Sequence, residues 1–178
     1  MKFASILILT FILGACQSTQ ASNPIQQKDN LKDLKENQSI IYLAGGCFWC
    51  TEALFSELKG IDSVFVGYIG GSAKNPTYEQ VCSGNTGHAE AIALIYDTTQ
   101  IQLSSILEVF FGTHDPTTLN QQGADRGTQY RSEIFYTSEN QKVTSEKYIQ
   151  LIEKEKLYSS SIKTKITSAP TFYPAENY

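Results

Sequence analysis

The sequence has few of the features that mark a disulfide-bonded, nucleic-acid-binding or disordered protein. Its 178 residues include only four cysteines, too few for a disulfide scaffold at this length. It has no run of five lysines or arginines, and its net charge of -4 argues against an electrostatic grip on nucleic acid. Only 18% of the residues are charged and 41% are hydrophobic, which excludes wholesale disorder. The length and composition of the chain are typical of one globular domain.

The N-terminal apolar run is too short to cross a bilayer as a mature helix. It covers residues 3–13, follows Lys2, and leads into LGAC ending at Cys16. This order resembles a bacterial lipoprotein signal, in which the cysteine becomes the lipidated first residue of the mature protein. We therefore expect a signal peptide over residues 1–15 and a lipidated Cys16 with a polar tether over residues 16–38. An ordinary secretory signal or a short uncleaved anchor is the alternative, and all three place the domain outside the cytoplasm.

Hydrophobic periodicity in the remaining chain, residues 39–178, predicts alternating strands and helices. Short β-branched or alternating segments predict strands at residues 39–45, 61–71, 89–97, 132–138 and 162–167. Helical spacing predicts helices at residues 48–60, with Leu54 and Leu58 on one face, at residues 103–111, and from Ser138 to about Leu157. This order predicts a two-layer α/β domain with helices packed on a mixed sheet.

The motif GGCFWC, residues 45–50, carries candidate redox chemistry. Cys47 is predicted at a helix N-terminus, where unpaired amide groups favour the thiolate. Cys50 lies one turn later on the same face, so the two thiols can close and reopen a disulfide. A Cys-x-x-Cys pair by itself fits thiol oxidoreductases and metal sites equally. The aromatic pair Phe48 and Trp49 could line a pocket for a methyl group, or could simply pack in the core.

Three segments together resemble the A-type peptide-methionine sulfoxide reductases. They are GGCFWCTE at residues 45–52, YEQVCSGNTGHAE at residues 78–90 and FFGTHDPTTLNQQGADRGTQYRS at residues 110–132. The resemblance implies an α/β (α+β) fold, a two-layer sandwich with a ferredoxin-like core. It also implies reduction of the S epimer of methionine sulfoxide, free or in proteins, with no metal or organic cofactor. We expect the enzyme to act as a monomer.

The family's site residues match positions of this sequence one by one. The resemblance implies Cys47 as nucleophile, Phe48 and Trp49 as walls of the methyl pocket, Glu90 as proton donor to the sulfoxide oxygen, Tyr78 and Tyr130 as phenols that bind this oxygen, and Asp125 as an orienting residue. A sulfoxide oxygen is a poor leaving group, so attack at sulfur requires proton delivery. Burial must therefore raise the pKa of Glu90.

The product of attack would be a sulfenic acid on Cys47, which a nearby thiol condenses to a disulfide. Many family members carry glycine at the position of Cys50 and use cysteines in a C-terminal tail, whereas this chain ends at FYPAENY. The resolving role then falls to Cys50, and truncation at the C-terminus is one interpretation. An external dithiol must reopen the disulfide, thioredoxin or an exported thioredoxin-like protein. Gln121 replaces a usual arginine, from which we expect an effect on binding.

Other interpretations of the cysteines remain open at this point. A zinc site could be made by Cys47, Cys50, Cys82 and His88, although the spacing of the second pair is unusual. A lipid-anchored binding module or a general thiol-disulfide oxidoreductase are further alternatives. Cys82 alone is interpreted as a small buried hydrophobe, and His88 and His114 as hydrogen-bonding residues.

Overall fold

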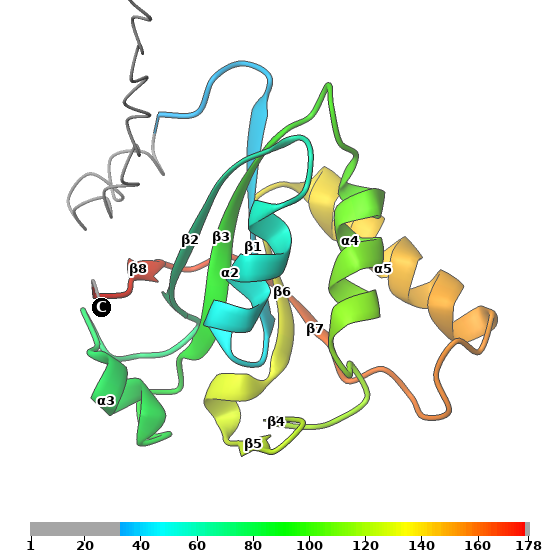
Figure 1. Ribbon diagram of the computed structural model, residues 1–178. Coiled ribbons are helices and arrows are strands. Elements are labelled where there is room, and N and C mark those ends of the chain that lie inside the picture. The colour runs from blue at the N-terminus through cyan, green and yellow to red at the C-terminus, as the bar shows by residue number, and fades with distance from the viewer. Residues whose placement is uncertain (1–32, 177–178) are drawn as a thin grey trace, which may run out of the picture.

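A six-stranded mixed sheet forms the centre of the protein in a computed structural model that describes residues 33–176 (Figure 1). The strand order is β7-β6-β1-β3-β2-β8, and all neighbours pair antiparallel except β6 and β7. The strands are β1 (Gln38–Gly45), β2 (Ile61–Ile69), β3 (Ala89–Asp97), β6 (Ser132–Tyr136), β7 (Lys165–Ser168) and β8 (Tyr173–Pro174). The predicted signal peptide and Cys16 lie outside the described residues.

The predicted ferredoxin-like core is confirmed. Helix α2 (Phe48–Ser56) connects β1 to β2, and helix α4 (Leu103–Thr113) lies between β3 and β6. The four strands of this unit stand in the order β6-β1-β3-β2. The two strands that each helix connects are therefore separated in the sheet by one other strand. A third helix, α5 (Glu139–Lys154), packs beside α4. Between α4 and β6 lie the short pair β4 (Gln121–Gln122) and β5 (Asp125–Arg126) and the 3-10 turn η1 (Thr128–Tyr130).

Helices and sheet enclose the main core as the apolar periodicity predicted. All five apolar positions of the predicted helix at residues 103–111 are buried in α4, namely Leu103, Ile106, Leu107, Phe110 and Phe111. They pack against the alternate residues Ile92, Leu94 and Tyr96 of β3. Because successive strand residues point to opposite faces, Ala91, Ala93 and Ile95 enter a second cluster on the other face of the sheet.

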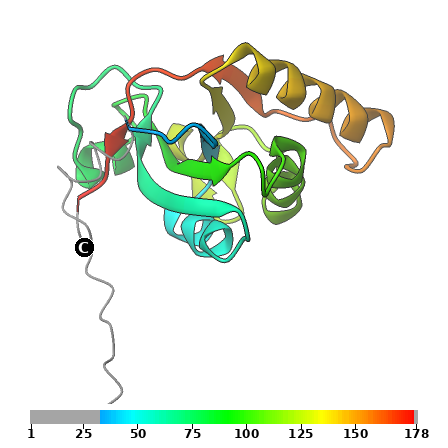
Figure 2. The same cartoon turned by 90° about the horizontal axis from the view of Figure 1, so that it is seen from above.

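The C-terminal segment covers that second face. Strands β7 and β8 lie at opposite edges of the sheet, so residues 169–172 must cross it between them, as Figure 2 shows in red. Ala169 and Phe172 pack on the small side chains of β3 during this crossing. The crossing brings the chain to β8 beside β2, close to the short helix α3 (Tyr78–Cys82).

Several predicted boundaries were wrong. The buried face of α2 consists of Phe48, Thr51 and Phe55, whereas Leu54 is 46% exposed. Phe48 and Phe55 bury more apolar area than the alternative leucine face, and the helix ends at Ser56, before Leu58 can join it. Helix α5 ends at Lys154, three residues early, and β7 begins at residue 165 instead of 162. Within residues 33–176, no helix is long and apolar enough to cross a membrane.

Candidate active site

The turn between β1 and α2 places Cys47 above the sheet. Gly46 has a φ of +103°, and a Cβ built on it would lie 2.6 Å from Cγ of Gln122. An L side chain at this position would therefore be strained in its backbone and crowded in space. Cys47 follows as the N-cap of α2, which confirms its predicted position at a helix N-terminus.

Opposing effects act on the Cys47 thiol. The backbone N–H groups of Trp49 and Cys50 donate to its sulfur, which favours the thiolate as expected. Burial acts more strongly in the other direction, and the nearby Glu90 and Cys50 also disfavour a negative charge. The pKa of Cys47 is consequently raised above its ordinary value of 9.0. The resting nucleophile is a neutral thiol in spite of its helix-terminal position.

Glu90 lies on β3 next to this cysteine and is 1% exposed. The antiparallel register pairs Glu90 with Tyr68 of β2, and on its other side Leu43 of β1 pairs with Ile92, two residues further along β3. The end of β1 therefore lies level with Glu90, which explains how the β1–α2 turn reaches the carboxyl.

The two oxygens of the Glu90 carboxyl have different surroundings. Oε2 accepts a hydrogen bond of 3.2 Å from the backbone N–H of Phe48. The buried Oε1 has no hydrogen-bond partner among residues 33–176. Burial raises the pKa of Glu90 to about 7, and the charge of Asp125 acts in the same direction against the Phe48 hydrogen bond. The predicted elevation of this pKa is confirmed, and near neutral pH the carboxyl can carry a transferable proton at Oε1.

Aromatic side chains form a wall beside the two acidic groups. Phe48 is buried and lies between Tyr68, at a ring-centroid distance of 5.8 Å, and Tyr78, at 6.3 Å with an interplanar angle of 24°. Trp49 is 45% exposed and lies 5.7 Å from the Tyr78 ring. Phe48, Trp49 and Tyr78 thus form an aromatic cluster in which Phe48 is buried and Trp49 is exposed to solvent.

The phenols predicted to bind an oxygen come from α3 and η1. Tyr78 interacts with the thiol of Cys82, one turn later on α3, and this hydrogen bond is the main reason why its pKa is raised. Burial raises the pKa of Tyr130, and the charges of Glu90, Cys82 and Asp125 add to this effect. Both phenols remain protonated near neutral pH and can donate hydrogen bonds. Cys82, interpreted from the sequence as a buried hydrophobe, is half-buried and contacts a site residue.

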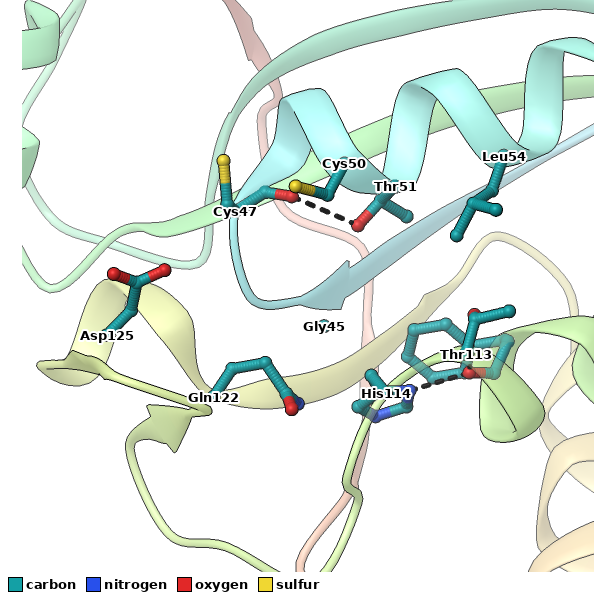
Figure 3. Close-up of a pocket in the computed structure, with 10 residues that line it drawn as sticks. Gly45, Cys47, Cys50, Thr51, Leu54, Thr113, His114, Gln122 and Asp125 are labelled. Atoms are coloured by element: carbon teal, nitrogen blue, oxygen red, sulfur yellow. Dashed lines mark hydrogen bonds between the residues drawn. The ribbon is translucent and has the colours of Figure 1, made fainter.

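On the other side of Cys47 lies a cavity of about 130 Å³. Figure 3 shows Cys47, Cys50, Thr51 and Leu54 along the α2 wall, with Asp125 and Gln122 opposite. Both cysteines line this cavity, and Cys50 is exposed whereas Cys47 is half-buried. Asp125 is exposed on β5, and its effect on the pKa values of Glu90 and Tyr130 places it near both.

Arg131 joins the loops that carry the site, and only its place in the third motif could have indicated this role. Its Nη1 donates to the carbonyl oxygens of Gly87 and Thr128 at 3.2 and 2.9 Å, which links the segment before Glu90 to the turn before Tyr130. Its Nε donates to Glu133 at 2.5 Å in a largely buried ion pair. Such a paired guanidinium fixes the relative position of both segments.

The zinc interpretation finds no support in the described part of the chain, where no three potential ligands cluster. His88 uses both ring nitrogens otherwise: Nδ1 accepts from the N–H of Gly71 at 3.1 Å, and Nε2 donates to the Ala73 oxygen at 2.8 Å. His114 hydrogen-bonds the Phe110 carbonyl and Ser132. Both histidines therefore have the hydrogen-bonding roles that the sequence predicted.

Comparison with known proteins gives a consistent result. The family model described as peptide methionine sulfoxide reductase matches residues 39–178. A curated relative from Acinetobacter baumannii (strain AYE), peptide methionine sulfoxide reductase MsrA, is 53% identical over 134 residues, which are 75% of this chain and 76% of the relative.

Two solved structures are also similar to this chain. Reduced Mxr1 from Saccharomyces cerevisiae has a TM-score of 0.77 and 34% identity, with 83% of this chain and 84% of that chain covered. Mxr1 in complex with Trx2 has a TM-score of 0.59 and 25% identity, covering 80% of this chain and 86% of that chain.

Replacing Gly46 with alanine tests the turn that positions Cys47. We expect Gly46→Ala to lower the free energy of unfolding by about 2 kcal/mol, because it combines positive-φ strain with a clash against Gln122. Urea unfolding measures this change. The control is Gly112→Ala in α4, whose Cβ would meet nothing within 4 Å and which should gain up to about 1 kcal/mol. Equal effects of the two substitutions would contradict the assigned geometry.

Proposed function

This chain belongs to the peptide methionine sulfoxide reductase family and reduces methionine S-sulfoxide to methionine at the expense of thiols, and we propose that Cys47 and Glu90 carry the reaction. The observation that supports these two residues most strongly is the Glu90 carboxyl. One of its oxygens is bound by the amide that follows Cys47, and the other is a buried oxygen without a partner in the described residues. A protonatable group next to a thiol is the pair that a sulfoxide requires.

In the proposed first step the Cys47 sulfur attacks the sulfoxide sulfur. The methyl group packs on the aromatic cluster of Phe48, Trp49 and Tyr78, while the sulfoxide oxygen accepts hydrogen bonds from Tyr78, Tyr130 and protonated Glu90. The attack forms a bond between the two sulfurs, and proton transfer turns the sulfoxide oxygen into a hydroxyl group. This hydroxyl passes to Cys47 as the S–O bond of the substrate and the bond between the two sulfurs break. The substrate sulfur gains two electrons and leaves as a thioether, and Cys47 loses two and becomes a sulfenic acid.

Cys50 completes the proposed cycle. Its thiol attacks the sulfenic sulfur, a disulfide forms and water leaves. The i, i+3 spacing on α2 and the shared cavity support this pairing, since a one-turn separation meets the distance that a disulfide needs. Asp125, opposite Cys47 across the cavity, helps to keep Glu90 protonated.

We propose a thioredoxin-like protein as the reductant. The yeast relative Mxr1 has been solved in complex with Trx2, and Cys50 is the more exposed residue of the pair. A partner thiolate would therefore attack Cys50 and expel Cys47. A general thiol-disulfide oxidoreductase would need the two cysteines but would have no use for a buried, protonated Glu90, so the geometry favours sulfoxide reduction.

The pH dependence of the first step follows from two raised pKa values. The reactive form carries one proton between Glu90 and Cys47, so its population is largest between the pKa of Glu90, about 7, and the higher pKa of Cys47. We expect the second-order rate constant for reduction of an S-sulfoxide peptide to rise up to about pH 7, to stay level, and to fall above the pKa of Cys47. Single-turnover measurements with pre-reduced protein provide this profile.

Glu90→Gln is the matching variant for that profile. It should lower the rate constant at least about 100-fold, because the amide cannot supply the proton. It should also abolish the inflection near pH 7 and the fall at high pH, leaving only the rise with the thiolate. A Glu90→Gln profile with the wild-type inflections would contradict the assigned role.

Cys50→Ser tests the resolving step. One turnover without reductant should convert wild-type protein to a form that lacks two hydrogens, whereas Cys50→Ser should retain a sulfenic acid on Cys47 that dimedone traps. Mass spectrometry of peptides distinguishes the two products. Cys82→Ser serves as the control and should still form the Cys47–Cys50 disulfide. A disulfide between Cys47 and Cys82 in the wild-type protein would overturn the assignment.

We further propose that the enzyme is a lipoprotein anchored outside the cytoplasm through Cys16, with residues 16–38 as its tether. The proposal is supported by the apolar run and the LGAC sequence alone. Cells that express the full chain should incorporate labelled palmitate into the protein and retain it in the membrane fraction. Cys16→Ser should abolish the labelling. Equal labelling of the variant, or none of the wild type, would contradict this localisation.

A further inference from the structure

Glu176, near the C-terminal end of the described residues, reaches the aromatic cluster. Its Oε2 accepts a hydrogen bond of 3.0 Å from the phenol of Tyr68, and its Oε1 accepts one of 3.0 Å from the backbone N–H of Tyr78. One carboxylate therefore bridges strand β2 and the first residue of helix α3. The three groups come from positions 68, 78 and 176, so only the folded chain brings them together.

The backbone before Glu176 is firmly placed. Tyr173 and Pro174 pair with β2, and the Ala175 N–H donates to the Val66 oxygen at 3.0 Å. Ala175 is buried in a small cluster with Phe48, Tyr68 and Val81. The carboxylate thus extends from an anchored segment, and its two hydrogen bonds to an amide and a phenol are of the stronger, charge-assisted kind.

Helix α3 depends on such outside contacts. It has only five residues, too few for a helix to be stable by itself. Its C-terminal end is fixed by the buried Val81 and by the Gln129 side chain, which donates to the Cys82 oxygen at 3.3 Å. At its N-terminal end Thr77 forms a capping box, a contact local to the helix, and Glu176 supplies a tertiary bond. Glu176 thus adds a tertiary hydrogen bond at the Tyr78 end, beside the ring contacts of Tyr78 with Phe48 and Trp49.

The position of Tyr78 matters because the aromatic cluster is open at this point. Trp49 is exposed and Tyr78 is only partly buried, so both rings lie on the solvent-facing side of the aromatic cluster. Tyr68, the other residue bound by Glu176, lies directly under Phe48 and is fully buried. The same carboxylate therefore binds Tyr68, which contacts Phe48, and Tyr78, which contacts Phe48 and Trp49.

We propose that Glu176 is a positioning residue that sets the shape of the methyl-binding aromatic cluster by holding Tyr78 against Trp49 and Phe48. This inference rests on the proposed function of that cluster. Glu176 touches no reacting atom, so its loss should weaken substrate binding and leave the chemical step of bound substrate nearly unchanged.

The test compares wild type with Glu176→Gln in the full chain, in single-turnover reduction of a peptide with one methionine S-sulfoxide. Glutamine has the size of glutamate but cannot accept from both donors with full charge. We expect the half-saturating peptide concentration to rise roughly tenfold, with a limiting rate within about twofold of wild type. Glu79→Gln is the control, because it removes an exposed carboxylate from the same short helix.

Trp49 gives a second readout that needs no catalysis, since it is the only tryptophan of the chain. In Glu176→Gln its fluorescence should shift to longer wavelength and become more accessible to acrylamide. Tyr68→Phe should change both signals in the same direction, and the double variant should be no worse than Glu176→Gln, because the two groups share one interaction.

Unchanged half-saturation and unchanged Trp49 fluorescence in Glu176→Gln would overturn the proposal. Equal changes in Glu79→Gln would overturn it too, as would a lower limiting rate at unaltered half-saturation. A wild-type protein inactive on the peptide would instead contradict the proposed function, and Glu176 would then be judged by the Trp49 signal alone.

Discussion

A carboxyl group buried at the start of a central strand is the constraint on which the site depends. Glu90 is 1% exposed, and its pKa of about 7 lies well above the ordinary value of 4.5. A shift of this size means that ionising Glu90 in the folded state costs on the order of 3 kcal/mol. The free energy of unfolding therefore falls as the pH rises from the ordinary pKa of 4.5 through about 7. The one amide that donates to it belongs to Phe48. The hydrogen bond from Phe48 to Glu90 therefore also places Cys47, the preceding residue, next to the carboxyl.

The ferredoxin-like arrangement explains why distant segments meet at this carboxyl. Strand β3 lies between β1 and β2, so the end of β1 and Tyr68 of β2 stand on either side of Glu90. The β1–α2 turn then supplies the thiol, and η1 supplies Tyr130 from the connection that precedes β6. Arg131 links η1 to the segment before Glu90, and the C-terminal crossing over the sheet ends beside Tyr78. Cys47, Glu90 and Tyr68 therefore come from the end of β1, from β3 and from β2, which lie side by side in the sheet.

Sequence patterns predicted those parts of the protein that depend on local spacing. The apolar spacing of α4 identified all five of its buried residues, and the three motifs named the thiol, the acid, the aromatic pair and the phenols. The prediction that Leu54 and Leu58 lie on the core-facing side of α2 was wrong. The larger rings of Phe48 and Phe55 are buried instead. Tyr68, Arg131 and Glu176 were missed as parts of the site. Their roles arise from hydrogen bonds between segments far apart in sequence, and no periodicity in the sequence records such contacts.

The opposing effects on the pKa of Cys47 keep its thiol neutral near pH 7. Two amides favour its thiolate, but burial and the neighbouring Glu90 disfavour it more strongly, and burial also raises the pKa of Glu90 to about 7, so that part of it stays protonated at neutral pH. Two neutral groups in one site avoid the cost of burying a charge without a partner. In the proposed reaction a sulfoxide changes this balance, because its oxygen accepts hydrogen bonds from Glu90 and the phenols while its sulfur receives electrons from Cys47. In this proposed mechanism the substrate would supply the acceptor that the buried acid lacks, which would couple recognition of the S–O bond to activation of the thiol.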